Sequence, residues 1–496
     1  MCGKSAKQLE TMPRPSRRSF LAAAAASAAS ATLAARQATG APAPRSGEID
    51  VVIVGAGAAG IAAARRIAAA GRHYVLIEAA DHSGGRCITD TRTFGVPFDR
   101  GAHWIHLPDT NPVAKLTPGH GIEIYPAPES QKVRIGLRNA REGELEDFLA
   151  AQVRATRAIA DAARKSDVAC EQALPNDLGD WRPTVEFVLG PFAYGKDLAQ
   201  LSTVDFARAS ERKADAFCRQ GFGALLAARA AGIAVQLSTP ATAIDIGRVV
   251  EVQTPKGAIA ARAAIVTVST NVLASDRIRF TSELPPRVTE AFNSLSLGSY
   301  DHIALELSGN PLGLDTDDLV FEKSADAHTA AILGNVSGTP LCLIEVAGSF
   351  GRELSAQGEA AMVDFAGDWL AKLYGAEVKK AVRRASATRW DADARTLGGM
   401  SAAVPGGHAA RAVLAEPLHD AVWFAGEAVH ETLWGTVGGA WESGERAADA
   451  VLRRLGGLKE PEAEERRPVR KRKPIRRRAE PREFGGTPRI MREKQR

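Results

Sequence analysis

The sequence predicts an α/β fold whose first unit is a strand, a tight turn, a helix and a second strand. Residues 49–54 form a continuous apolar run, which is typical of a parallel strand covered on both faces. The next residues follow the spacing G-x-G-x-x-G, with the glycines at Gly55, Gly57 and Gly60. An alanine-rich segment of helical periodicity comes next, and a second apolar strand, residues 74–77, leads into Glu78. This combination indicates a Rossmann-like βαβ unit that binds a dinucleotide.

Each part of this unit suits a bound pyrophosphate. The first glycine permits a tight turn, the second lets the backbone approach the pyrophosphate, and the third lets helix and strand pack closely. The helix N-terminus offers unpaired N–H groups and the positive end of a dipole to the phosphates. The carboxylate of Glu78 can accept hydrogen bonds from ribose hydroxyls and would repel a 2′-phosphate.

Length and composition are those of a large globular protein. The chain has 496 residues, of which 45% are hydrophobic and 24% are charged, so it is long enough for more than one domain. The net charge of +5 is unevenly placed: residues 1–45 carry +6 and residues 459–496 carry +8, which leaves −9 for the body. An acidic body gives no reason to expect specific nucleic-acid binding. The five cysteines have no paired or metal-like spacing, so we expect neither a disulfide framework nor a metal site.

Residues 1–45 resemble a twin-arginine export signal. Arg17 and Arg18 precede Phe20, Leu21 and an alanine-rich run to Ala35, which is too short and too weakly apolar for a good membrane span. The twin-arginine machinery exports bacterial proteins that have already folded and bound their cofactor. We therefore expect this machinery as a partner and a periplasmic or secreted location. A low-complexity tail is the alternative.

The C-terminal segment, residues 458–496, is predicted to be a basic disordered tail. Prolines, clustered like charges and few hydrophobic residues are typical of a chain that cannot form a packed core. Such a tail can contact anionic lipid or another polyanion, or it can be a solvated appendage without a partner.

The segments after the second strand carry further motifs. The segment SGGR contains the doublet Gly84–Gly85 and Arg86, which resembles the GG-Arg doublet of two-dinucleotide-binding flavoproteins, where glycines and a guanidinium meet the FAD phosphates; this resemblance implies FAD rather than NAD. GAHWIH follows at residues 101–106, and FAGE at 424–427 is expected to be a strand that ends in Gly-Glu. The later segment GTVGGAWESGERAA predicts a terminal helix with a packing stripe of Ala440, Ala447, Ala448 and Val451.

These four segments, in this order, resemble the flavin-containing amine oxidases, which include monoamine oxidases, polyamine oxidases and lysine-specific histone demethylases. The resemblance spans residues 48–455. It implies a two-dinucleotide-binding (Rossmann-like) FAD domain that is interleaved with an α+β substrate domain. The expected boundaries are FAD-domain parts at 46–130, 214–282 and 394–457, a helical substrate-domain part at 131–213, and a second substrate-domain part at 283–393.

The resemblance also implies which residues bind FAD. The ADP and phosphates would be held by Gly55, Gly57, Gly60, Glu78 and Arg86. Ala241 would lie near the adenine, and Glu427 would contact the ribityl-phosphate region. The residues along or near the flavin would be Gly101, Ala102, Trp104, Trp390, Gly435, Thr436 and Val437. Val437 opens the terminal helix, whose dipole end would favour negative charge on the reduced flavin. Residues 397–401 contain no cysteine, where covalent members of the family attach the cofactor, so we expect non-covalent FAD.

Three candidate catalytic positions depart from the family pattern. His302 stands where relatives keep a lysine beside flavin N5. Met400 and Thr436 stand where the family has the two aromatic residues of its substrate cage, although threonine also occurs in the demethylase-like branch. His106 matches an active-site histidine of animal polyamine oxidases, or it is a hydrogen-bonded structural histidine.

The strand that carries His302 is predicted to be half-buried. In SLGSYDHIALEL, residues 296–307, apolar and mixed positions alternate. One face carries Ile303, Leu305 and Leu307, and the other carries His302, Ala304 and Glu306. A histidine at the start of such a strand is either solvated or, by resemblance to the family, in the active site.

The activity implied by the resemblance is FAD-dependent oxidation of an amine. A hydride would pass from the α-carbon to flavin N5, and the resulting imine would hydrolyse to a carbonyl compound and an amine or ammonia. Oxygen or another acceptor would reoxidise the flavin. The substrate would be a primary or secondary amine, with polyamines among the candidates. Two alternatives are an oxidoreductase for amino acids or other small molecules and an exported FAD-fold binding protein with little turnover.

Non-covalent FAD gives a direct test. Acid precipitation of the purified protein should release yellow FAD into the supernatant, because no covalent bond would retain it. Absorption spectra of supernatant and pellet measure the distribution, and a yellow pellet would contradict the expectation.

Overall fold

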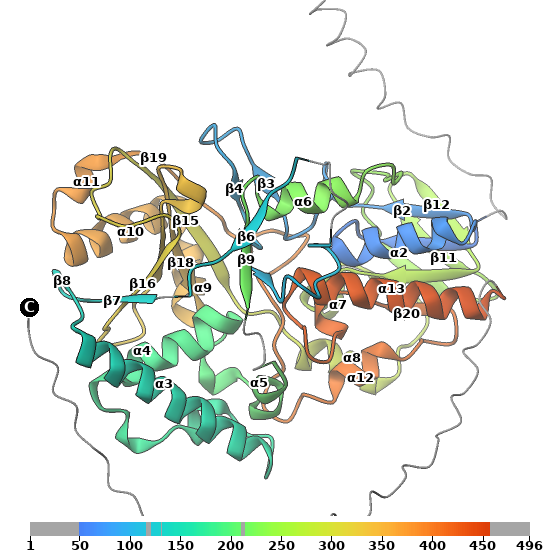
Figure 1. Ribbon diagram of the computed structural model, residues 1–496. Coiled ribbons are helices and arrows are strands. Elements are labelled where there is room, and N and C mark those ends of the chain that lie inside the picture. The colour runs from blue at the N-terminus through green and yellow to red at the C-terminus, as the bar shows by residue number, and fades with distance from the viewer. Residues whose placement is uncertain (1–48, 116–120, 130, 210–213, 457–496) are drawn as a thin grey trace, which may run out of the picture. The chain divides into compact units, whose positions relative to one another are not determined.

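The computed structural model of the protein describes residues 49–115, 121–129, 131–209 and 214–456 (Figure 1). The predicted export signal and basic tail lie outside these residues. Within them the chain forms five β-sheets with helices packed against them. Among these described residues, no helix has the length and apolar character needed to cross a membrane.

The first sheet is parallel and brings together three distant parts of the chain. In spatial order its strands are β2 (Tyr74–Ile77), β1 (Val51–Val54), β13 (Ala263–Val266) and β20 (Val422–Phe424). Every strand residue except Tyr74 is buried, which explains the uninterrupted apolar runs. The predicted strand 424–427 is wrong in its extent: β20 ends at Phe424, and Glu427 begins the 3₁₀ turn η6 (Glu427–Val429). Gly426 takes φ 139° and turns the chain between them.

Two helices, α2 (Ala58–Ala69) and α13 (Val437–Arg454), lie side by side against one face of this sheet (Figure 1). Their backbones approach closely, because a Cβ on Gly444 would lie 2.1 Å from the carbonyl oxygen of Ala59. The predicted packing stripe of α13 is buried in the same core.

The opposite face of the parallel sheet is covered by a second sheet and three short helices. The second sheet has the order β12 (Gly257–Ala261), β11 (Val250–Thr254), β10 (Ala243–Ile246) and β14 (Arg279–Phe280). The helices are α7 (Thr270–Ala274), α8 (Pro286–Ser294) and α12 (Ala410–Ala415). Their apolar side chains share one core with Val52, Val54 and Ile77.

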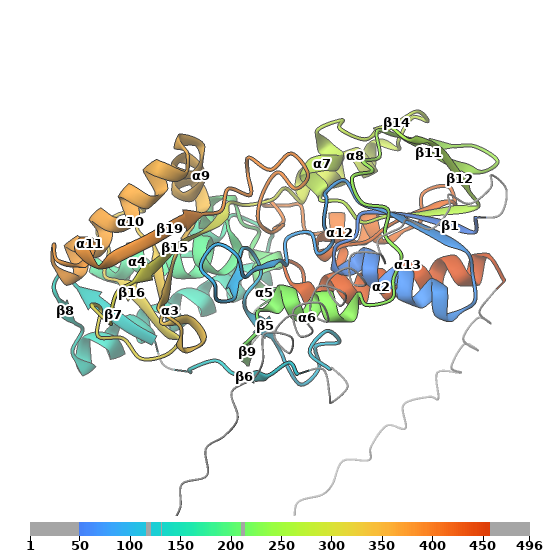
Figure 2. The same ribbon diagram turned by 90° about the horizontal axis from the view of Figure 1, so that it is seen from above.

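A seven-stranded sheet forms the centre of the other half. In spatial order its strands are β19 (Val382–Ala387), β15 (Tyr300–Leu307), β18 (Leu341–Ala347), β17 (Ala331–Gly334), β16 (Asp318–Glu322), β7 (Gln131–Ile135) and β8 (Arg138–Asn139). Three helices pack against this sheet near β15, β18 and β19 (Figure 2). They are α9 (Gly348–Gln357), α10 (Glu359–Tyr374) and α11 (Val378–Ala381). The parallel sheet and the seven-stranded sheet take their strands from alternating stretches of the chain, as an interleaved two-domain fold requires. The residue boundaries proposed from the sequence stay predictions.

The strand β15 is buried on both faces, so the prediction of a half-buried strand is wrong. Ile303 and Leu305 belong to the core shared with α10, and Ala304 on the other face belongs to a second core with Phe98 and Phe217. The alternation of side-chain types along β15 reflects two different buried environments rather than one solvent-exposed face and one buried face.

Helices and short turns between β8 and β9 pack against β7, β16 and β17. They are α3 (Glu142–Ala163), η1 (Cys170–Ala173), η2 (Asn176–Trp181), α4 (Arg182–Phe187), η3 (Val188–Phe192), η4 (Leu198–Gln200) and α5 (Thr203–Ala209). Two small sheets complete the described fold, one of β3 (Thr89–Asp90) with β4 (Phe98–Asp99) and one in the order β5 (Ile105–His106), β9 (Asp215–Cys218) and β6 (Ile124–Pro126). The remaining elements are the helix α6 (Phe222–Arg229) and the turn η5 (Val336–Gly338).

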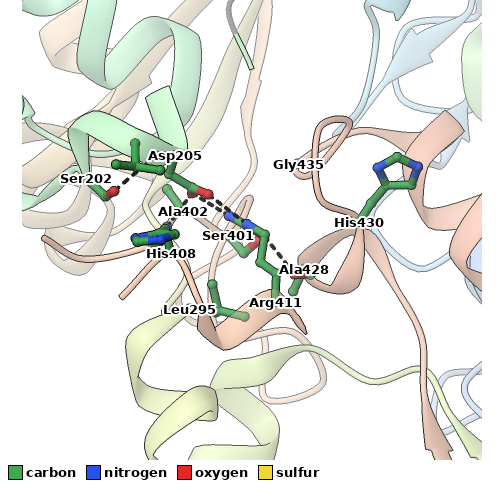
Figure 3. Close-up of polar contacts among 12 residues, drawn as sticks. Ser202, Asp205, Leu295, Ser401, Ala402, His408, Arg411, Ala428, His430 and Gly435 are labelled. Atoms are coloured by element: carbon green, nitrogen blue, oxygen red, sulfur yellow. Dashed lines mark hydrogen bonds and ion pairs between the residues drawn. The ribbon is translucent and has the colours of Figure 1, made fainter. Parts of the chain in front are cut away.

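A fully buried ion pair connects α5 to α12 (Figure 3). The guanidinium of Arg411 donates two hydrogen bonds to the carboxylate of Asp205, of 2.8 and 2.6 Å, and a third of 2.7 Å to the carbonyl oxygen of Ala428. The second carboxylate oxygen also accepts the backbone N–H of Ala403 at 2.8 Å. Because every partner is satisfied, this pair avoids the high cost of an isolated buried charge.

Candidate active site

The three glycines after β1 have different structural roles. Gly55 takes φ 102° and makes the turn. A Cβ on Gly60 would lie 1.9 Å from the carbonyl oxygen of Gly55, so helix and turn cannot pack against each other with any larger residue. A Cβ on Gly57 would find no atom nearer than 4.0 Å, the Cα of Gly85. Packing therefore requires Gly60, whereas only the approach of a ligand gives a reason for Gly57.

The carboxylate of Glu78 lies across the start of this loop. Its Oε2 accepts the N–H of Ala56 at 2.7 Å, and its Oε1 accepts the N–H of Ala80 at 2.8 Å. These two bonds hold the acid at the end of β2, where a ribose bound along the loop would meet it.

The SGGR segment, which was predicted to contact phosphates, lies beside the glycine-rich loop after β1. Gly84 takes φ 117° and donates its N–H to the carbonyl oxygen of Ala56 at 2.8 Å, which joins the two glycine-containing segments. Arg86 then reaches across the structure, and its Nη1 donates to the carbonyl oxygen of Gly399 at 2.5 Å and to Oε1 of Glu427 at 3.1 Å. Its side chain is 24% exposed.

Glu427 is the meeting point of three separate segments. Besides Arg86, its carboxylate accepts the hydroxyl of Ser401 at 2.6 Å and the N–H of Gly435 at 2.8 Å. Its side chain is 9% exposed. The neighbouring carbonyl, that of Ala428, is the one held by the buried Arg411 (Figure 3).

One cavity of about 1930 Å³ runs past all these groups. Every residue that the sequence predicted for the site lines it, with the exception of Gly60, which lies beneath the loop. The structure thus brings together Gly55, Gly57, Glu78, Arg86, Gly101, Ala102, Trp104, His106, Ala241, His302, Trp390, Met400, Glu427, Gly435, Thr436 and Val437.

Two of the residues predicted to lie near the flavin are closely packed together. A Cβ on Gly101 would lie 2.1 Å from the carbonyl oxygen of Arg86 and 3.0 Å from Cζ2 of Trp390. The indole N–H of Trp390 donates to the carbonyl oxygen of Arg100 at 3.0 Å. These contacts fix the position of the indole ring at the cavity wall.

Thr436 serves as the N-cap of α13. Its hydroxyl accepts the N–H of Gly439 at 2.9 Å and donates to the carbonyl oxygen of Leu433 at 2.6 Å. The hydroxyl is thus already engaged, and the helix start that it caps faces the cavity through Val437. Met400 lies opposite Gly435 and offers a flexible apolar side chain to the same wall.

His106 is paired with a residue that sequence reasoning missed. Its Nδ1–H donates to Oδ1 of Asp215 at 2.6 Å, and both side chains are about 30% exposed to the cavity. The two residues face each other because β5 pairs with β9 in the register His106↔Asp215. They are more than a hundred positions apart in the sequence, so no local pattern could have indicated the pair.

His302 lines the cavity but is only 2% exposed. Its Nδ1 lies 2.9 Å from the carbonyl oxygen of Asp99, and burial, together with the nearby charge of His103, lowers its pKa to about 4. The ring is therefore neutral at working pH. On the neighbouring strand Glu345 is completely buried, with Oε1 3.6 Å from Nε2 of His302. Sequence reasoning missed Glu345 as well, since its partner lies on another strand.

The sequence matches the family model of flavin-containing amine oxidoreductases over residues 58–452. The chain therefore belongs to the flavin-containing amine oxidoreductase family, and it is an FAD-dependent oxidoreductase.

Curated relatives include polyamine oxidases and histone demethylases. Polyamine oxidase 4 of Oryza sativa subsp. japonica is 26% identical over 449 residues, which cover 82% of this chain and 89% of that protein. Lysine-specific histone demethylase 2 of Homo sapiens is 24% identical over 435 residues, which cover 81% of this chain and 53% of that protein.

Solved structures share the fold. Cyclohexylamine oxidase from Brevibacterium oxydans IH-35A superposes with a TM-score of 0.70 at 20% identity, covering 82% of this chain and 100% of that one. A double mutant of putrescine oxidase superposes with a TM-score of 0.69 at 18% identity, covering 82% and 99%.

The residues in the cavity fit FAD. The open space above Gly57 and Gly85 leaves room for a pyrophosphate, the start of α2 directs N–H groups toward it, and Glu78 stands where the ribose would lie. The cavity is larger than a small ligand needs, and it extends from this loop to His302.

The different roles of Gly57 and Gly60 can be separated by substitution. Gly57→Ala should leave the unfolding free energy of the apoprotein within about 0.5 kcal/mol, since the protein has room for the methyl group. It should weaken FAD binding at least about tenfold, which is about 1.4 kcal/mol. Gly60→Ala should instead destabilise the fold by roughly 1–3 kcal/mol through overpacking.

Urea unfolding of the apoproteins and titration with FAD measure the two effects. Equal losses of stability in both variants would contradict the assignment of Gly57 to the ligand.

Proposed function

We propose that this protein oxidises a primary or secondary amine, with a polyamine-like substrate. The proposal rests mainly on one observation: the cavity that holds the cofactor residues continues without interruption to a wall made by β5, η3, β9, β15 and β16. In the proposed reaction the amine loses a hydride from its α-carbon and a proton from its nitrogen, and water hydrolyses the resulting imine to a carbonyl compound and ammonia or a smaller amine. Bound FAD would supply the hydride acceptor for this reaction, and oxygen or another acceptor would take up the two electrons.

The wall next to His302 suits an uncharged amine nitrogen. The ring of Tyr300 lies beside His302, with ring centroids 5.9 Å apart, and Phe192, Phe321 and the flexible apolar side chain of Met400 line the same cavity. Exclusion of water by such groups disfavours an ammonium ion relative to the free amine, and only the free amine can give up a hydride. The residues of this chain thus orient the substrate and keep its reacting nitrogen unprotonated.

The Asp215–His106 pair supports a second recognition point. The imidazole donates to one carboxylate oxygen, which leaves the other oxygen available to a positively charged group on the substrate. A diamine or polyamine carries a second ammonium group that can meet this carboxylate while the reacting end stays neutral.

An amino acid as substrate is less well supported. Its carboxylate would need a cationic partner, and the described lining residues of β5, β7, α3, η3, β9, β15 and β16 include no lysine or arginine; the arginines that line the cavity lie on its other segments, at positions 86, 92, 100, 277, 389 and 395. The carboxylate of Asp215 would repel such a substrate.

We also propose export to the periplasm or beyond, on the basis of the Arg17–Arg18 pair and the alanine-rich run that follows it. Fractionation of a bacterial host that expresses the full chain tests this, with Arg17→Lys/Arg18→Lys as the export-deficient comparison.

Anaerobic mixing with a panel of amines tests the activity. Spermidine, spermine, putrescine or a monoamine should bleach the flavin absorption, because hydride transfer reduces the ring. Bleaching by amino acids alone would favour the alternative oxidoreductase, and a spectrum that stays oxidised with the whole panel would reject turnover.

Asp215→Asn should distinguish substrates with one and two amino groups. Asparagine can still accept the hydrogen bond from His106 but lacks the negative charge. The KM for a diamine should rise about tenfold, in line with the roughly 1.5–3 kcal/mol of a charged hydrogen bond, while the KM for a monoamine changes little. Asp161→Asn, on the exposed surface of α3, is the matched control. Equal effects on both substrates would contradict the recognition role.

A further inference from the structure

Glu345 is a buried acid whose carboxylate lacks the usual partners. It lies in β18 and is 0% exposed, and among the described residues neither of its carboxyl oxygens makes a hydrogen bond of ordinary length, although the indole N–H of Trp104 and the hydroxyl of Tyr300 are near enough to favour its ionised form. Its direct cross-strand neighbour in β15 is His302. A buried carboxyl group normally finds a donor or an opposite charge, so this arrangement requires an explanation.

The hydrogen bond to Asp99 determines the tautomer of His302. A backbone carbonyl can only accept, so Nδ1 of His302 must carry the hydrogen of the 2.9 Å bond. In the neutral ring Nε2 is then an acceptor with a free lone pair. This atom lies 3.6 Å from Oε1 of Glu345.

Two acceptors that face each other in a buried site need a proton between them. The proton can lie on the imidazole, which creates a buried ion pair, or on the carboxyl group, which leaves both partners uncharged. With His302 2% exposed and Glu345 fully buried, the charged form loses most of its hydration. Burial accordingly raises the pKa of Glu345 to about 7, and it lowers that of His302.

Other groups surround the pair. On β15, Tyr300 faces Glu345, and burial raises the pKa of its phenol, so it stays neutral. Cys342, on the same strand as Glu345, also has a raised pKa. The charge of His103, the indole of Trp104 and the hydroxyl of Tyr300 favour the ionised carboxylate, and the pKa of His103 is raised because its hydrogen bond to Asp99 and the charge of that carboxylate outweigh the effect of burial. His103 itself is engaged through Nδ1 with the carboxylate of Asp99 at 2.8 Å.

We propose that Glu345 carries a proton in weakly acidic solution and shares it with the facing Nε2 of His302, a hydrogen bond that forms when the 3.6 Å separation shortens by a few tenths of an ångström, and that Glu345 is thereby the positioning residue for a neutral imidazole at the FAD cavity. The significance for catalysis rests on the proposed amine oxidation. The imidazole then presents no positive charge beside the reacting centre. The pair gains a negative charge only when Glu345 ionises, as pH rises through about 7.

Infrared absorption of the amine-free holoenzyme tests the protonation state directly. A carbonyl band of a protonated carboxyl group should be present at pH 6 and should disappear as pH rises through about 7. Glu345→Gln should lack this band at every pH. Glu322→Gln is the control, because Glu322 is a buried acid of the same sheet that is ion-paired with Lys372 and should leave the band unchanged.

A second variant keeps the proposal testable if Glu345→Gln fails to fold. His302→Phe keeps a ring in the same place but removes the acceptor, so the carboxyl band should move to higher frequency. The proposal is overturned if no carboxyl band at pH 6 is lost in Glu345→Gln, because the acid is then ionised. It is also overturned if the frequency of the band is unchanged in His302→Phe, because the acid is then paired with His103 instead.

The pH dependence of flavin reduction supplies the kinetic test. With an amine that reduces the flavin, the wild-type rate should change across pH 7, and Glu345→Gln should lose this inflection while its amide still donates to Nε2. Glu345→Ala, which cannot donate, should be slower by about tenfold, the lower end of the range for partners that orient a functional group. An inflection that persists in Glu345→Gln would contradict the role. The infrared result needs no amine, so failure of the proposed function would not obscure it.

Discussion

The carboxylate of Glu427 is the interaction on which the cofactor site depends. It accepts hydrogen bonds from Arg86, Ser401 and Gly435, which lie in three segments far apart in the sequence. Hydrogen bonds to a charged group contribute roughly 1.5–3 kcal/mol each, so this one residue contributes substantially to closing the site. The buried Arg411, bonded to Asp205 and to the carbonyl of Ala428, holds the turn that presents it.

Close backbone packing is the second constraint. The carbonyl oxygen of Gly55 leaves no room for a side chain at Gly60, and that of Ala59 leaves none at Gly444. These contacts bring α2 and α13 together with their N-terminal ends at the same cavity. Two positive dipole ends thereby face the space where phosphates and a reduced flavin concentrate negative charge.

Charge is arranged differently at the two ends of the proposed substrate path. Near His302 the groups are buried and the imidazole is neutral, which suits the uncharged nitrogen that must react. At Asp215 the side chain is partly exposed and keeps an acceptor oxygen available, which suits a second nitrogen that stays protonated. Under the proposed function, these two environments would receive the neutral and the protonated nitrogen of one substrate.

The local part of the fold and most of the cofactor site could be predicted from the sequence. Apolar runs, glycine spacing and helical periodicity are properties of neighbouring residues, so β2 was predicted with its bounds, α2 was predicted after the glycines, and β1 was predicted to begin at 49 where it begins at Val51. The start of α13 at Val437 was implied by the family resemblance. Nearly all the residues assigned to the site by resemblance line one cavity for the same reason, since the motifs carry their own geometry. The tertiary structure alone determined that β15 is buried on both faces, that β20 ends at Phe424, and that Asp215 and Glu345 join the site. Strand pairing brings these acids to His106 and His302 across long stretches of chain, and no local periodicity records which strands will pair.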